Sequence, residues 1–261
     1  MTTIWSLRAL CAAAFVLGAA PAAAQTPVDV QLVLAVDTSG SVNAARFELQ
    51  KQGYVAAFRH PRVLQAIRSG MHGAIAVTMT QWTGPALQVQ VMPWTLLKDQ
   101  ESLLAFAGAI EKAPRELFSG GTSISGAIDH AMRLLPSAPY RGLKRVIDVS
   151  GDGANNRGRP ATEARDDAVR AGVIINGLPI LALEPFLDTY YFNNVIGGPG
   201  SFMIPAESYE RFADAVLRKL VLEIASNELR HSEAFARRER PESITTAWDY
   251  GFRIRASRVP E

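Results

Sequence analysis

The chain has 261 residues, enough for one large domain or two small ones. Its 27 basic and 25 acidic residues nearly cancel and leave a net charge of +2. This balance gives no strong overall field for nucleic acid or for an anionic membrane, so we expect neither as a partner. The sequence has a single cysteine, Cys11, which excludes a disulfide bond within the chain.

The first 24 residues have the pattern of an export signal. Arg8 is the only charged residue before an apolar, alanine-rich run at 9–20, and three alanines at 22–24 form a cleavage pattern before Gln25. A membrane anchor is the alternative, but the run is shorter than the roughly 20 residues that span a bilayer. We therefore expect residues 1–24 to be a cleaved signal peptide and the mature protein to be periplasmic or secreted, with no transmembrane segment.

The first half of the chain contains strand and helix patterns in turn. Residues 30–36 form an apolar run without polar alternation, which is typical of a strand covered on both faces of a parallel sheet. Residues 87–91 alternate strictly, which indicates an exposed edge strand. The other expected elements are a helix that includes Phe47 and Phe58 and stops at Pro61, a strand at 73–80, and a helix capped by Asp99.

The second half continues the alternation. The expected elements are a helix after Gly120-Gly121-Thr122, a strand at 146–149, a helix from Pro160 towards Gly172, a buried strand at 172–178, a long loop at 184–200, a short strand at 202–204 and a last helix capped by Ser208. Alternation of this kind predicts an α/β fold with a doubly wound, mostly parallel sheet, one antiparallel edge strand and helices on both faces. We expect the domain to span residues 28–230 and the arginine-rich residues 231–261 to form a loosely packed tail.

Polar side chains follow the predicted strands where a ligand site would lie. Asp37, Ser39 and Ser41 come directly after the first strand, and Asp152 follows a later one. Thr122 opens a helix. In open α/β sheets the ligand crevice lies at the carboxyl ends of the strands, and hard divalent cations prefer oxygen ligands.

These three segments, in this order, resemble the metal-ion-dependent adhesion site of von Willebrand factor A domains. The resemblance covers the mature chain up to Arg230. One departure is that Ser150-Gly151 precedes Asp152, where the family usually has hydrophobic residues and a threonine. The run at 190–200 resembles a bacterial exported subfamily of unassigned function.

The resemblance implies a metal site and a binding function. Ser39, Ser41 and Thr122 would be oxygen ligands, and Asp37 and Asp152 would balance charge directly or through water. Neutral hydroxyls with two acids suit Mg²⁺, or Mn²⁺ in its place, better than Ca²⁺. In the family one coordination position stays open for a partner carboxylate. We therefore expect a non-enzymatic module that binds a protein through an exposed Asp or Glu.

Two other functions remain open from the sequence. The same residues could serve only turn and helix-cap hydrogen bonds, in which case the domain would be a metal-free scaffold. Ser123 lies in a partial nucleophile-elbow pattern, which would make the protein a serine hydrolase, but Ser125 stands where the last glycine belongs. The aromatic residues at 190–192 either form a contact surface or pack the long loop onto the sheet.

Overall fold

The described part of the chain is built on a five-stranded sheet. The structure is a computed structural model that describes residues 25–238. For residues 226–238 it describes the helix but not the side chains. The strand order is β3-β2-β1-β4-β5, with β3 antiparallel at one edge and the other neighbours parallel. This confirms the predicted sheet. The strands are β1 (Thr26–Asp37), β2 (Ile75–Trp82), β3 (Gln88–Leu97), β4 (Tyr140–Gly151) and β5 (Ile174–Pro179).

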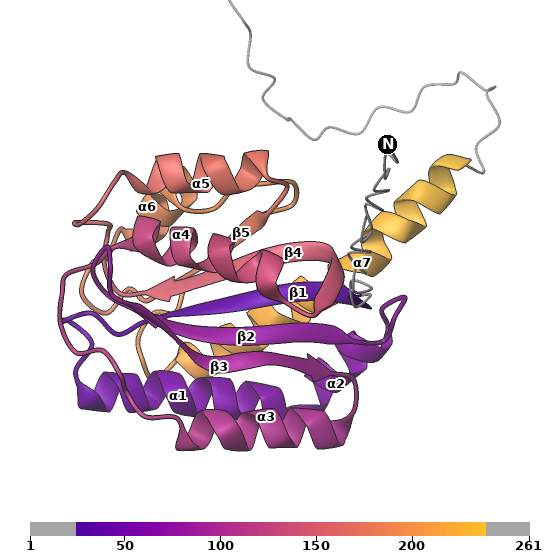
Figure 1. Cartoon of the computed structure of the whole chain (residues 1–261), viewed down its shortest axis with the longest axis horizontal. Helices are drawn as coiled ribbons and strands as arrows, with labels where there is room; N and C mark the ends of the chain where they lie inside the picture. Colours follow the sequence, from indigo (N-terminus) through magenta and orange to yellow (C-terminus); the bar gives the residue numbers. More distant parts are fainter. Residues whose placement is uncertain (1–24, 239–261) are drawn as a thin grey trace, which may run out of the picture.

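Helices cover both faces of the sheet, as the sequence predicted (Figure 1). One face carries α1 (Ala44–Arg59), α2 (Pro61–Arg68), α3 (Gln100–Lys112) and α7 (Phe212–Arg238). The other carries α4 (Ile124–Leu134), its 3₁₀ extension η1 (Leu135–Ser137), α5 (Ala161–Arg170) and α6 (Leu187–Asn194). The carboxyl ends of the parallel strands lie at the left of Figure 1.

Strand β1 is apolar throughout because it separates two cores. Leu32 and Leu34 belong to the core under α1, α2, α3 and α7, whereas Val33 and Ala35 belong to the core under α4 and α5. Successive strand side chains point to opposite faces, so a strand covered on both sides needs an apolar residue at nearly every position.

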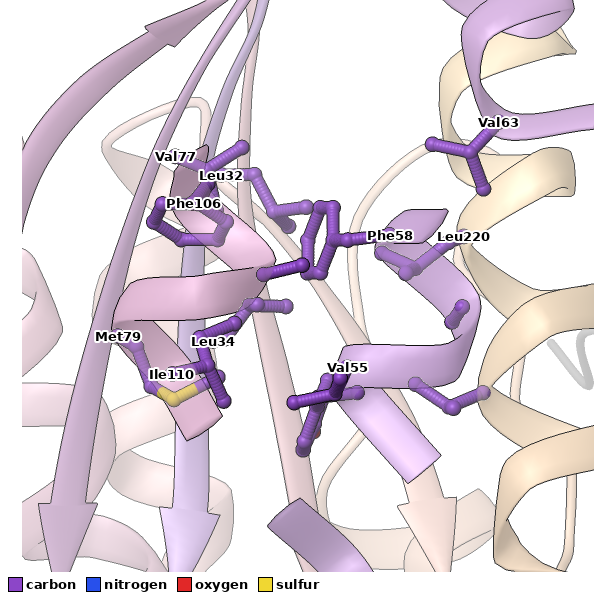
Figure 2. Close-up of a cluster of buried hydrophobic side chains, with 14 of the residues drawn as sticks. Leu32, Leu34, Val55, Phe58, Val63, Val77, Met79, Phe106, Ile110 and Leu220 are labelled. Atoms are coloured by element: carbon purple, nitrogen blue, oxygen red, sulfur yellow. The ribbon is translucent and has the colours of Figure 1, made fainter. Parts of the chain in front are cut away.

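The larger core closes around two phenylalanines from neighbouring helices (Figure 2). The rings of Phe58 on α1 and Phe106 on α3 meet edge to face, with centroids 4.9 Å apart. Leu220 of α7 points into the same cluster. Edge-to-face pairs add stability beyond the area they bury, so this contact helps to hold α1 against α3.

Several sequence-based boundaries were wrong. The expected loop at 184–200 contains helix α6, and residues 202–204 form only an isolated bridge, Met203 with Gly177. The last helix begins at Phe212 instead of after Ser208, and it continues past Arg230 to Arg238. The Pro61 break opens helix α2, because proline suits a first helical turn.

The export signal expected at 1–24 and the tail residues 239–261 lie outside the described residues. Within residues 25–238, no helix has both the length and the apolar character needed to cross a bilayer.

Candidate metal centre

The polar residues predicted from the sequence meet at the carboxyl ends of β1 and β4. These strands are neighbours, and Val36 pairs with Ser150 in their parallel register. Asp37 ends β1, and Asp152 directly follows β4. The turn after β1 runs to Asn43, whose side chain caps α1. The strand pairing therefore places two carboxylates, 115 positions apart in the chain, at one point.

Four of the five predicted residues form one hydrogen-bond network. The Asp37 carboxylate accepts from the backbone N–H of Ser39 at 2.7 Å and faces the N–H of Asp152 at 3.4 Å. The hydroxyls of Ser39 and Ser41 are 3.1 Å apart. Ser41 Oγ donates to Asp152 Oδ1 at 2.5 Å. Hydroxyl and carboxylate oxygens thus lie close together, and Asp37 and Asp152 are buried from solvent.

The fifth residue, Thr122, approaches from the loop before α4. Its backbone N–H donates to Asn156 Oδ1 at 2.9 Å, and its carbonyl accepts from the N–H of Asn156 at 2.9 Å. A Cβ placed on Gly153 would lie 3.7 Å from Thr122 Oγ1, so the hydroxyl lies beside the loop that carries Asp152. Gly121 has φ of +82°, a conformation that glycine adopts without a steric penalty.

The unusual Gly151 has a physical reason. A Cβ at this position would lie 2.9 Å from Asp37 Oδ2, 2.9 Å from the hydroxyl of Tyr191 and 3.3 Å from the ring of Trp82. Atoms at such distances must move, so a larger residue would push the Asp37 carboxylate out of place. Glycine at this position therefore leaves room for the Asp37 carboxylate beside the end of β4.

The two acids raise a charge problem. The pKa of Asp37 is raised to about 7, first by burial and then by the negative charge of Asp152. The pKa of Tyr209, whose hydroxyl donates to Asp152 Oδ2 at 2.7 Å, is raised by burial and by that same carboxylate. Two carboxylates in a low-dielectric site repel each other unless a cation or a proton separates them.

No cation from the described residues forms an ion pair with Asp37 or Asp152. Two arginines come close but bind backbone oxygens. Arg115 donates to the carbonyls of Thr38 and Ser39 at 2.9 and 3.3 Å, and Arg46 donates to the carbonyl of Ser41 at 2.7 Å. They hold the ligand turn from two sides and leave the acids unneutralised.

The donor set fits a hard divalent cation. It consists of hydroxyl and carboxylate oxygens, which Mg²⁺ prefers, and Mg²⁺ keeps several waters and needs few protein carboxylates. The described residues contain no group of three or more His, Cys, Asp or Glu side chains that could hold a metal. A cation here would therefore depend on Ser39, Ser41 and Thr122 as well as on the two acids.

Sequence reasoning missed the supporting residues. Tyr209, Arg46 and Arg115 contact the site from other parts of the fold. Gln50 on α1 donates to the backbone carbonyl of Asp37 at 3.1 Å. None of them lies in a local motif. Only the buried helix face that contains Gln50 could have suggested an inward-facing polar residue.

The residues of the alternative functions have local roles. Ser123 is buried, caps α4 by accepting from the N–H of Gly126, and lies 3.3 Å from Ser125 Oγ. Neither partner is a histidine, so capping accounts for this serine. The aromatic residues at 190–192 lie on α6 and differ in exposure. Tyr191 is fully buried in the smaller core, whereas Phe192 is 65% exposed.

Comparisons with known proteins give the family of the chain. A family model described as "Protein of unknown function (DUF1194)" matches residues 27–228. The chain belongs to this family. A comparison with curated proteins gave no match.

Solved structures show the same fold at low sequence identity. Proximal thread matrix protein 1 from the mussel byssus is similar with a TM-score of 0.55 and 18% identity, over 77% of this chain and 47% of that one. Another structure of that protein, with a zinc-occupied MIDAS motif, has a TM-score of 0.54 and 17% identity, over 76% of this chain and 46% of that one. The pilus adhesin SpaC from Lactobacillus rhamnosus GG has a TM-score of 0.54 and 16% identity, over 77% of this chain and 30% of that one.

The fold is therefore of the von Willebrand A type, as the sequence motifs predicted. This chain spans less than half of the length of these solved chains. At such low identity the likeness concerns the fold alone.

Proposed function

We propose that this protein is an exported, non-enzymatic binding domain that uses a bound Mg²⁺ to recognise an acidic group on a protein partner. The observation that carries the proposal is the buried pair Asp37 and Asp152, held beside the hydroxyls of Ser39 and Ser41 without a cation from the described residues. A divalent cation would neutralise both acids. Thr122 would supply a third hydroxyl.

The surroundings of the site favour an acidic partner. Arg46 and Arg115 lie beside the turn that carries the serines, and neither forms an ion pair with a carboxylate among the described residues. With the two acids neutralised by the metal, these guanidinium groups would attract a negatively charged side chain. Phe118, 65% exposed and 5.0 Å from the Arg115 guanidinium, adds an apolar contact at the same loop.

The similar structures support binding as the function class. One is a pilus adhesin, and one form of the mussel byssus protein has zinc in its MIDAS motif. We carry over only the expectation of a divalent metal, and Mg²⁺ is chosen from the donor chemistry, with Mn²⁺ as its closest substitute. Residues 1–24 as signal peptide and a domain that begins at residue 28 complete the proposal, with the periplasm or the exterior as location.

Affinity capture tests the function. The purified domain is immobilised and exposed to an envelope extract in buffer with Mg²⁺ or with EDTA. The proposal predicts a partner that is retained only with Mg²⁺, is released by a short poly-glutamate peptide and is not retained by Asp152→Ala. Equal retention with EDTA would contradict metal-dependent recognition and favour the metal-free scaffold.

A further inference from the structure

A second charged cluster lies inside the protein, away from the metal centre. Asp148 on β4 and Lys219 on α7 are both fully buried, and Glu223, one turn further along α7, is 2% exposed. The cluster joins the strand next to the centre of the sheet to the long helix that packs across it (Figure 1). Charged groups are rarely buried to this degree, because removal from water is costly.

The three side chains are in direct contact. Lys219 Nζ lies 2.5 Å from Glu223 Oε1 and 2.7 Å from Asp148 Oδ1. Glu223 Oε1 also accepts from Asn176 Nδ2 at 2.9 Å. The ring of Phe202 lies 5.3 Å from Lys219 Nζ. The Lys219 amine thus contacts both acids, Glu223 and Asp148, inside an apolar core.

The approach of Lys219 to Asp148 is unusual. Nζ lies within 2.7 Å of Oδ1, yet neither carboxyl oxygen of Asp148 has a partner in hydrogen-bond geometry. Buried polar atoms almost always have such a partner, so a carboxyl with two unsatisfied oxygens needs an explanation. The short contact brings the Lys219 amine to the Asp148 carboxyl, while both carboxyl oxygens stay without a hydrogen bond.

The protonation of Asp148 suits such a reaction. Burial, followed by the negative charge of Glu223, raises the pKa of Asp148 to about 7. Near neutral pH a large fraction of this group is therefore the carboxylic acid, which an amine can attack, instead of the unreactive carboxylate. Lys219 with its proton and Glu223 without one then balance each other in charge.

We propose that Lys219 and Asp148 become joined by an amide bond inside the folded core, with Glu223 as the proton carrier. The Lys219 ammonium transfers one proton to the Glu223 carboxylate and becomes a neutral amine, the form that is nucleophilic. Nζ then forms a bond to Cγ of the Asp148 carboxylic acid. Glu223 moves a proton from nitrogen to a hydroxyl oxygen on Cγ, the C–O bond breaks, and water leaves.

The atoms and charges balance without a further reactant. The ammonium, the carboxylic acid and the carboxylate become a secondary amide, one water molecule and a protonated Glu223. All products are neutral, which an apolar interior favours over separated charges. The link would tie β4, whose end carries Asp152, to α7 and restrict the unfolded chain in the way that a disulfide does.

Mass spectrometry of the purified full-length gene product tests the proposal. The intact mass should be one water molecule below the value calculated from the sequence and the observed N-terminus. Trypsin should release residues 146–157 joined to residues 219–230 as a branched peptide. Glu223→Gln, which keeps the shape and leaves Lys219 paired with Asp148, should fold and keep the full mass, whereas Glu48→Gln on the surface of α1 should still lose water.

Three results would overturn the proposal. The first is a wild-type protein with the full calculated mass. The second is a mass lower by one ammonia, with the branch at Asn176, which would show that Lys219 reacts with Asn176 and not with Asp148. The third is a Glu223→Gln variant that is linked as completely as the wild type, which would exclude Glu223 as the proton carrier.

Discussion

Two buried aspartates, Asp148 on β4 and Asp152 directly after it, have surroundings that differ in one respect. Asp148, inside the core, has Nζ of Lys219 2.7 Å from its Oδ1. Asp152, directly after the strand, has hydroxyl donors from Ser41 and Tyr209 but forms no ion pair with a cation of the described residues. The inner acid has a lysine of the chain as its partner, whereas the proposed metal centre leaves the neutralisation of the outer acid, next to Asp37, to a cation from solution. Under the proposed function, this difference separates a structural site from a binding site.

Removal of Lys219 should have the largest effect. Lys219→Met removes the proposed amide link to Asp148 and leaves Asp148 and Glu223 buried without their lysine partner, which should cost about 3–5 kcal/mol of the free energy of unfolding. Urea denaturation measures the loss. The triple variant Lys219→Met, Asp148→Asn and Glu223→Gln should recover the part of the loss that comes from the buried acids, because no ionisable group of the cluster remains, but not the part that comes from the link. A single variant as stable as the wild type would remove the contrast between the two aspartates.

Metal-free protein should lose stability as pH rises. Asp37 has a pKa of about 7 in the folded chain, raised from 3.8, so between about pH 4 and 7 the folded state binds a proton that the unfolded state has lost. Its contribution is complete below that window and declines across it by at most about 1.4 kcal/mol per pH unit.

Other acids titrate in the same range, so the informative quantity is the difference between wild type and Asp37→Asn. In EDTA, the free energy of unfolding of the wild type should fall relative to the variant from pH 4 to 7. Mg²⁺ should remove this decline, because a cation stabilises the ionised acid. A rise of the wild type relative to the variant would show that the chain itself stabilises the ionised form.

The smallest predicted effect concerns the arginines beside the site. Arg115→Gln keeps a polar side chain but removes the charge next to the turn of Ser39, which should weaken capture of the acidic partner by about 1 kcal/mol, or about fivefold. Arg133→Gln, in the last turn of α4, is the matched control and should not change it. If both variants reduce retention equally, the arginine acts through overall charge and not at the site.

The sequence predicted the sheet and the meeting of Asp37, Ser39, Ser41 and Asp152, because both depend on local patterns at strand ends. It could not predict contacts that join distant segments. Lys219 lies beside the apolar stripe of the last helix and resembles an ordinary surface lysine, yet it is fully buried. Tyr209 reaches Asp152 from 57 positions away. Helix α6 was missed because only Leu187 and Tyr191 are buried in it, too few for a periodic pattern.

The most direct test of the metal centre is a Mg²⁺ titration of the free energy of unfolding at pH 7.5, without any partner. For the wild type, a concentration 100 times the dissociation constant should add about 2.7 kcal/mol. Asp152→Ala should gain nothing, and in EDTA it should be at least as stable as the wild type, because its loss relieves the repulsion with Asp37. Wild-type stability that does not change with Mg²⁺ or Mn²⁺, or an Asp152→Ala variant that gains as much, would contradict the proposed metal centre.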